Sequence, residues 1–187
     1  AMTPRRLTVL TMLAGCALLA VPAISGHGPR YIWNASASVP IGLYQIEPID
    51  RIEVADLVAV MPPEPLAGFL AERGYLARNV PLIKRVLAVS GTTVCRRRTT
   101  IIAYDHAYGE AHETDALGRD LPSWQGCRQL RDGEVFLMNW NASDSFDGRY
   151  FGPLPLSSIV TRLVPVWTDV DGDGRFQWHA DSVSAEP

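Results

Sequence analysis

The apolar and polar residues divide the chain into an N-terminal apolar stretch and a longer part with short apolar runs. Residues 7–24 are mostly apolar and follow the pair Arg5-Arg6. Eighteen residues that rise 1.5 Å each in a helix reach roughly 27 Å, enough to span a thin bilayer. The alternative, a buried helix of a soluble protein, is seldom apolar on every face. We therefore expect residues 1–25 to be a membrane anchor or an export signal.

An anchor and a cleavable signal differ at the end of this stretch. Residues 20–25 supply small side chains but only a weak cleavage site, which favours an uncleaved anchor. The arginine pair would then stay in the cytoplasm, and residues 26–187 would form one domain on the far side of the membrane. A length of 187 residues fits one globular domain and such a short extra segment.

Beyond residue 42 the apolar runs are short, rich in β-branched residues and separated by Gly and Pro, which is typical of strands. The predicted strands are 57–61, 82–89, 92–96, 101–104, 134–139, 159–167 and 175–178. One helix is predicted over about 64–73, with Pro65 in its first turn and Gly74 after its end. The fold class expected is mainly β, with this short helical insertion and an N-terminal apolar helix.

Composition excludes several kinds of partner. The formal net charge of −3 gives no basis for nucleic-acid binding. Residues 169–174 imitate the start of a calcium loop, but the twelfth position is Ala180 where such a loop needs a bidentate glutamate, so we expect a turn between strands. The four histidines show no zinc spacing with the cysteines. We therefore expect neither a metal nor a cofactor.

Two of the three cysteines lie in the part of the chain expected outside the cytoplasm. They are Cys95 and Cys127, whereas Cys16 lies in the apolar stretch. An even pair in an oxidising compartment predicts a disulfide between Cys95 and Cys127. The alternative is two unrelated buried thiols.

Lysine occurs once in the chain, at Lys84, while the other sixteen of the seventeen Lys+Arg residues are arginine. Lys84 lies in the predicted strand 82–89, on one face with Leu82 and Val86. If that face is interior, burial would lower the pKa of the amine from ~10.4 towards ~8, at a folding cost of about 3.3 kcal/mol. A neutral amine can accept a proton, which a guanidinium cannot. The alternative is a surface lysine in an arginine-rich chain.

Two further segments supply polar groups that could work with such an amine. Ser38 stands two residues before Pro40 and four before Gly42. A proline and a glycine so close together predict a sharp turn, which would present the Ser38 hydroxyl and backbone N–H to a bound peptide. Residues 143–153 contain two serines and two aspartates beside Arg149, and they could orient a neutral amine. An ordinary turn and a polar loop are the respective alternatives.

Together the three segments resemble the serine/lysine signal peptidases, and most closely the TraF-type peptidases of conjugative transfer systems. Residues 36–44 are similar to their nucleophile box, 84–94 to their lysine box and 145–153 to their closing box. The resemblance implies a signal-peptidase-like β-sheet or barrel domain. Ser90, Thr92 and Gly148 depart from the common pattern, because proline, aspartate and serine are usual at these positions.

The resemblance implies a role for each matching residue. Ser38 would be the nucleophile and Lys84 the general base. The Ser38 backbone N–H, with the Ser36 hydroxyl, would form the oxyanion hole. In the closing box, Ser145 would orient the lysine amine, and Asp147 would form with Arg149 a buried pair that shapes the site.

The resemblance also implies a membrane-anchored serine endopeptidase whose catalytic domain lies in the periplasm, at the inner membrane. Its substrate would be a pilin precursor or another exported membrane protein, which some members of the family cyclise. Two alternatives stay open. One is a general type I signal peptidase, and the other is a non-catalytic β-domain that scaffolds pilus assembly.

Overall fold

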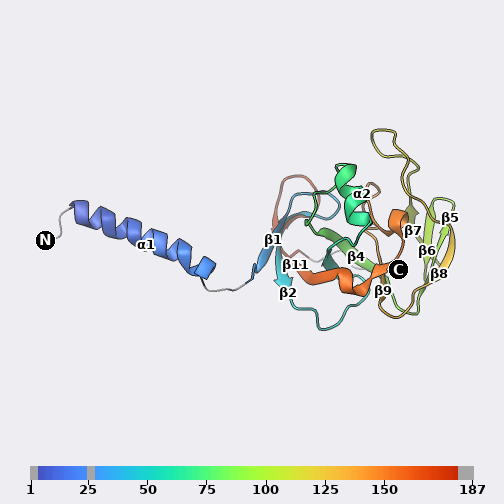
Figure 1. Ribbon diagram of the computed structural model, residues 1–187, viewed down its shortest axis with the longest axis horizontal. Helices are drawn as coiled ribbons and strands as arrows, with labels where there is room; N and C mark the ends of the chain where they lie inside the picture. The colour runs from blue at the N-terminus through green and yellow to red at the C-terminus, as the bar shows by residue number, and fades with distance from the viewer. Residues whose placement is uncertain (1–3, 25–27, 181–187) are drawn as a thin grey trace. The chain divides into compact units, whose positions relative to one another are not determined.

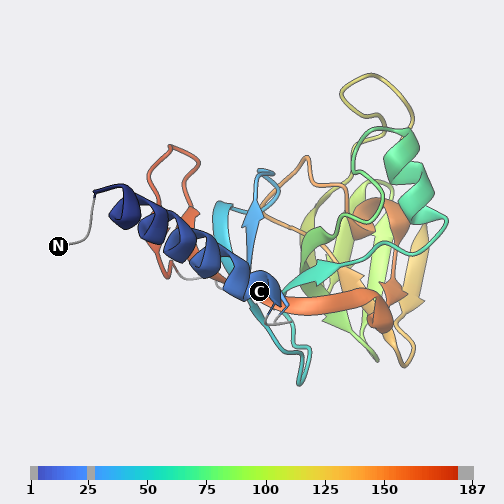
Figure 2. The same ribbon diagram turned by 60° about the vertical axis from the view of Figure 1, so that its left-hand side comes forward.

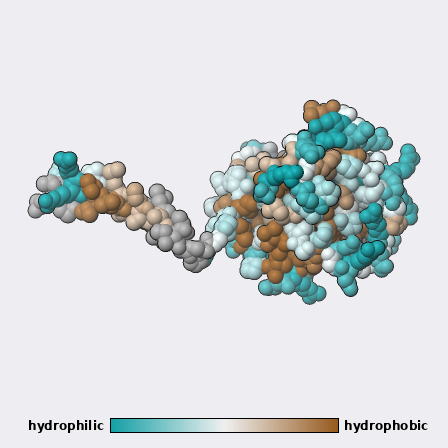
Figure 3. Space-filling view, in the orientation of Figure 1, coloured by the Kyte–Doolittle hydropathy of each residue, from teal (hydrophilic) through white to brown (hydrophobic). Residues whose placement is uncertain are grey.

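The structure is a computed structural model that describes residues 4–24 and 28–180, with the backbone alone described at residues 19 and 21–24. The chain divides into two units, Ala1–Arg30 and Tyr31–Pro187. The first contains helix α1, Pro4–Ile24, which is hydrophilic at its start and hydrophobic over the next coloured turns (Figure 3). Among the fully described residues, no helix is long and apolar enough to cross a membrane. The expected anchor falls partly on residues outside this description and stays a prediction.

The second unit is built mainly from β-strands, as expected (Figures 1 and 2). Its strands are β1 Tyr31–Asn34, β2 Ile41–Glu47, β3 Leu57–Val60, β4 Leu82–Val89, β5 Thr93–Arg97, β6 Thr100–Ala103, β7 His106–Glu110, β8 Gly126–Gln129, β9 Glu134–Leu137, β10 Leu154–Pro155, β11 Ile159–Asp169 and β12 Gln177–Trp178. Its helices are α2 Leu66–Glu72, α3 Gly148–Phe151 and the 3-10 turn Leu156–Ser158. The predicted helix over about 64–73 is thus α2, slightly shorter at both ends.

The described strands form two open antiparallel sheets. The larger has the order β1-β2-β11-β3-β4-β9-β10, with β12 beside β11, and the smaller has the order β7-β6-β5-β8. Strand β11 pairs with both β2 and β3 and therefore connects the β1–β2 hairpin to the β3–β4 pair. Residues 170–176 join β11 to β12, and the side chain of Asp169 accepts the backbone N–H groups of Asp173 and Gly174. The calcium-like run is therefore a turn between strands, as expected.

Strand β4 lies in the interior of the unit. Its six central residues, 83–88, are all buried, so both faces of the strand are covered rather than one. Val86 packs in one apolar cluster with strands β3 and β9, and Leu87 packs in another with the four-stranded sheet. This burial on both sides explains the near-continuous apolar run in the sequence. It also places the single lysine of the chain inside the protein.

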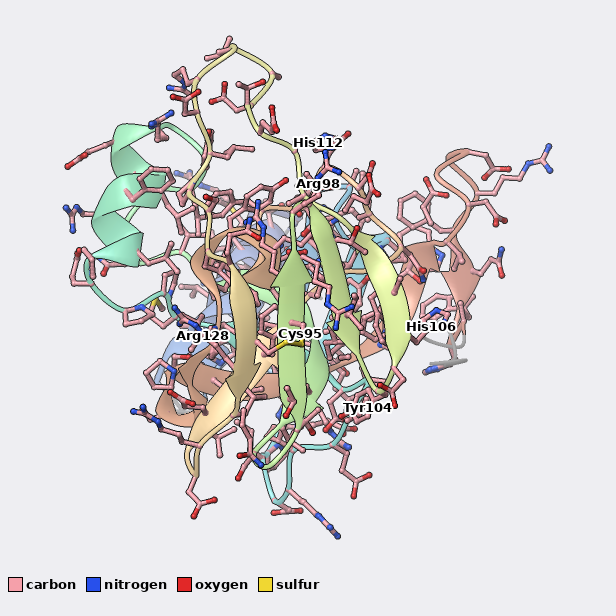
Figure 4. The ribbon with its side chains drawn as sticks, turned by 90° about the vertical axis from the view of Figure 1, so that its right-hand side faces the viewer. Cys95, Arg98, Tyr104, His106, His112 and Arg128 are labelled. Atoms are coloured by element: carbon pink, nitrogen blue, oxygen red, sulfur yellow. A yellow bond between two sulfur atoms is a disulfide. The ribbon has the colours of Figure 1, made fainter. Side chains whose placement is uncertain are left out.

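A disulfide joins Cys95 of β5 to Cys127 of β8, and Figure 4 shows Cys95 in the middle of the four-stranded sheet. The two residues are directly opposite each other in the antiparallel ladder. All four residues of β8 are exposed, so burial contributes little to holding this edge strand. The disulfide therefore ties β8 to its neighbour covalently.

The double variant Cys95→Ser/Cys127→Ser should lower the free energy of unfolding by roughly 3–4 kcal/mol, since the bond closes a loop with a sequence separation of 32 residues. Denaturant unfolding measures this loss, and Cys16→Ser in α1 is the control that should leave the second unit unchanged. A thiol count on protein exported to the periplasm should find both cysteines oxidised. Two free thiols in the second unit would contradict the prediction.

Candidate active site

The turn that carries Ser38 connects β1 to β2. Asn34 and Gly42 are the last residues of this hairpin that pair with each other, and residues 35–41 connect them. Gly42 has a φ of 151°, and a Cβ at this position would overlap the carbonyl oxygen of Trp167 in β11. The glycine thus lets the hairpin lie close to the neighbouring strand. Ser38 is half-buried and lines a cavity.

Lys84 lies in the middle of β4 and is only 3% exposed. Its Nζ donates a hydrogen bond to the Oγ of Ser145 at 2.8 Å. Burial lowers the pKa of the amine to about 8, an effect that Asp147 opposes and Arg149 assists through their charges. A substantial fraction of Lys84 is therefore neutral at mildly alkaline pH.

The lowered pKa has a cost in stability. In the unfolded chain the amine holds its proton up to about pH 10.5, so between about pH 8 and 10.5 the unfolded state binds more protons than the folded state. Stability therefore rises with pH across this window, and below it the buried ammonium costs about 3 kcal/mol. Proteins tolerate such costs mainly at functional sites.

Asn139 holds the backbone of β4 on both sides of Lys84. Its Oδ1 accepts the N–H of Arg85 at 2.9 Å, and its Nδ2 donates to the carbonyl of Ile83 at 3.2 Å. The side chain thereby continues the sheet ladder beyond the end of β9. The sequence pattern predicts Asn139 only as the end of a strand, although a polar residue at the end of an apolar strand is a usable signal for a further role.

Asp147 and Arg149 form a buried ion pair at 2.9 Å, with side chains no more than 1% exposed. Asp147 also caps α3 by accepting the Arg149 backbone N–H. The guanidinium donates in addition to the carbonyls of Glu110, Asn139, Ala142 and Ser143. The loop that contains Ser145 therefore wraps around Arg149, which fixes the position of the serine that contacts Lys84.

The close packing around position 148 explains why this chain has a glycine where a serine is usual. A Cβ on Gly148 would lie 2.7 Å from the Leu137 carbonyl oxygen and from the Phe136 ring. We expect Gly148→Ala to lower the free energy of unfolding by about 1–3 kcal/mol through overpacking. Gly68→Ala in α2 is the matched control, since it meets only side-chain ends and should be neutral or slightly stabilising. Equal effects of the two substitutions in denaturant unfolding would contradict this explanation.

Four of the residues predicted for the site line a single cavity of about 960 Å³. They are Ser36, Ser38, Lys84 and Ser145. The Ser36 Oγ lies 3.3 Å from the Ser38 Oγ. The Ser36 hydroxyl also donates to the Oδ1 of Asn34 at 3.0 Å, and its expected part in the oxyanion hole stays a prediction. The other two predicted residues, Asp147 and Arg149, are buried and do not line the cavity.

The cavity runs between the edge strand β1 and a wall made by α2 and the loop after β7, which lie beside each other in Figure 2. The wall is tied together by Tyr75, whose hydroxyl donates to Asp115 at 2.5 Å. Apolar side chains such as Leu70, Leu82 and Leu121 dominate the lining. Such a cavity can hold an extended peptide and exclude water from the buried amine. Among the described residues, no cluster of His, Cys, Asp and Glu could hold a metal ion.

A family model described as "Signal peptidase, peptidase S26" matches residues 5–168. The chain belongs to this family of signal peptidases. The match covers the cavity, both walls and all the boxes that carry the predicted site. The expected resemblance to serine/lysine signal peptidases is therefore confirmed at the level of the family.

Several relatives of this signal peptidase are TraF proteins. A conjugal transfer protein TraF of Agrobacterium fabrum is 36% identical over 149 residues, which cover 74% of this chain and 82% of the relative. A plasmid transfer protein TraF of Escherichia coli is 33% identical over 177 residues, covering 88% and 97% of the two chains. The expected likeness to TraF-type peptidases is thus confirmed as well.

Two more distant peptidases also match. Thylakoidal processing peptidase 1 of Arabidopsis thaliana is 30% identical over 112 residues, which cover 60% of this chain and 31% of that protein. A solved signal peptidase I from Enterococcus faecalis V583 is 19% identical, with a TM-score of 0.38 and coverage of 62% of this chain and 98% of that chain.

Proposed function

We propose that this signal peptidase is a serine endopeptidase that works by a Ser38/Lys84 dyad. The observation that carries the proposal is the buried amine of Lys84, which is held by Ser145, has its pKa lowered to about 8 and opens on the same cavity as Ser38. A buried lysine with this pKa suits a general base near neutral pH.

In the first half of the reaction, neutral Lys84 takes the proton of the Ser38 Oγ while this oxygen attacks the scissile carbonyl. The tetrahedral intermediate collapses to an acyl-enzyme, and the leaving amine receives the proton from the Lys84 ammonium. In the second half, Lys84 again acts as the base and activates the water or amine that resolves the acyl-enzyme. The Ser145 hydroxyl keeps the amine oriented throughout.

The negative oxygen of the tetrahedral intermediate needs donors that are already in place. We assign this role to the backbone N–H of Ser38 together with the hydroxyl of Ser36. For Ser36 to donate, its hydroxyl must rotate from Asn34 towards the substrate oxygen. The Ser36 amide can keep its bond to Asn34 during this rotation, so the turn stays in place.

The proposed substrate is a pilin precursor or another exported membrane protein of a conjugative transfer system, because the TraF relatives are named conjugal and plasmid transfer proteins. The proposed location is the inner membrane, with the catalytic unit in the periplasm. The basic start and apolar course of α1 support an anchor, and the Cys95–Cys127 disulfide supports an oxidising compartment. Either water or the N-terminal amine of the substrate would resolve the acyl-enzyme.

Mass spectrometry of a pilin precursor incubated with the enzyme tests this proposal directly. A shortened product supports cleavage, and a product lighter by one further water identifies cyclisation. Cleavage of many unrelated exported precursors at similar rates would instead indicate a general signal peptidase. Failure of a covalent serine probe to label Ser38, with no precursor cleaved, would indicate a non-catalytic scaffolding domain.

A further inference from the structure

Asn34 directs every hydrogen bond of its side chain into the turn that carries Ser38. The residue ends β1 and is 5% exposed. Its Nδ2 donates to the carbonyls of Ser36 at 2.7 Å, Val39 at 3.1 Å and Pro40 at 3.1 Å. Its Oδ1 accepts the backbone N–H of Ser36 at 3.1 Å and the Ser36 hydroxyl at 3.0 Å. One side chain thus holds both ends of the turn.

An asparagine suits this position because of the groups that surround it. The turn directs three carbonyls and two donors towards its own centre, and an unpaired buried polar group costs about 1–3 kcal/mol. The carboxamide supplies two N–H donors and an acceptor oxygen on a short side chain. An aspartate keeps the acceptor but places a carboxylate oxygen against three carbonyls. A serine offers only one donor and is too short to reach both ends.

The bonds to Ser36 also determine how the nucleophile is held. Because the Ser36 hydroxyl gives its proton to Asn34, its oxygen is left to accept, and in the 3.3 Å contact with Ser38 the nucleophile is therefore the donor. The same bonds fix the Ser36 amide and hence the course of the backbone to the Ser38 N–H. Asn34 thus positions the attacking oxygen in the resting turn, and through the Ser36 amide it positions the backbone N–H of Ser38.

We infer that Asn34 is a positioning residue of the peptidase, which acts through Ser36 and Ser38 and does not contact the substrate. The inference rests on the proposed function and extends it to a residue outside the three boxes of the site. Asn34 pairs with Gly42 at the turn end of the β1–β2 hairpin, so its amide connects the sheet to the turn.

Asn34→Ala should lower kcat per active site about 100-fold, the size of effect expected when reacting groups are misplaced by about 1 Å. KM should stay within about threefold, because Asn34 adds little surface to the cavity at 5% exposure and the apolar side chains that dominate the lining are kept. Active sites are counted by titration with a covalent serine probe, so a partly unfolded preparation still gives a kcat for its folded fraction. The midpoint of the pH profile should also stay the same, because the surroundings of Lys84 are not altered.

Asn34→Asp is the second variant, since it keeps the size and the acceptor but removes the donors, and it should be as slow as Asn34→Ala. Gln125→Ala is the matched control. The Gln125 amide also bonds a turn through both of its ends, because its Nε2 donates to the Arg98 carbonyl at 2.9 Å and its Oε1 accepts the Arg98 backbone N–H at 3.0 Å, but it does not line the cavity. Its loss should change kcat by less than about threefold, because it holds neither Ser36 nor Ser38.

The outcomes separate the inference from the function on which it rests. If the native protein cleaves its precursor and both Asn34 variants keep kcat per titrated site within about threefold of native, the inference alone is wrong. The same conclusion follows if the variants lose only the number of titratable sites, which is what a merely structural role predicts. If the native protein neither cleaves nor reacts with the probe, the proposed function fails and the inference fails with it.

Discussion

Ser38→Ala should abolish processing, with a fall in kcat of about 10⁴-fold or more, because it removes the oxygen that forms the acyl-enzyme in the proposed mechanism. The substitution removes one half-buried hydroxyl whose one hydrogen-bond contact among the described residues is the 3.3 Å one to Ser36. The free energy of unfolding should therefore change by less than about 1 kcal/mol. Thermal unfolding beside a cleavage assay measures both quantities on one preparation.

Ser143→Ala is the matched control for this loss. Ser143 is an exposed serine of the loop around Arg149, and its hydroxyl contacts only the side chain of Asp144. Its backbone carbonyl, which Arg149 binds, is kept in the variant, so activity should stay at the native value. Cleavage by Ser38→Ala at a rate near the native one would show that Ser38 is not the nucleophile.

The sequence pattern predicted the elements whose own residues carry the signal for their structure. Strand β4 was found with the correct ends, because burial on both faces leaves a continuous apolar run. Helix α2 was found because Pro65 and Gly74 mark its two ends. In both cases the signal lies within the element itself.

Strands that depend on distant partners were missed. All residues of β8 are exposed, so its sequence shows no alternation, and the strand exists through pairing and a disulfide to β5. Strands β1 and β2 were treated only as the surroundings of the serine turn. Of the predicted strand 175–178, only the two residues of β12 pair with β11. Pairing over long sequence separations leaves little trace in a local pattern.

The residues of the site divide in the same way into those that the sequence predicted and those that it did not. Ser38, Lys84 and Ser145 could be placed in one site because their residue types and order match a known family. The roles of Asn34 and Asn139 were not predicted, because an amide side chain gains its importance from the backbone groups around it. Of the two, Asn34 was easier to find from the sequence, since asparagine side chains often bond the backbone two residues further on in turns.

Lys84→Arg should be as inactive as Lys84→Ala, although arginine is the cation that the chain uses at every other basic position. The proposed mechanism needs an amine that loses its proton, and a guanidinium stays charged at any usable pH. Burial and the bond to Ser145 suit the amine, whereas the larger planar group would also have to displace the Ser145 loop. Cleavage assays on the two variants measure the loss, and Arg97→Lys on the exposed end of β5 is a control that should stay active.

The native enzyme should show the matching pH dependence. Because the base must be neutral, kcat should rise with pH through one ionisation near the lowered pKa of Lys84, about 8, and level off above it. A free lysine would place this midpoint near 10.5. A pH profile flat across this range, or substantial activity in Lys84→Arg, would make Lys84 an electrostatic partner of the site. The base that activates Ser38 would then have to be sought elsewhere in the cavity.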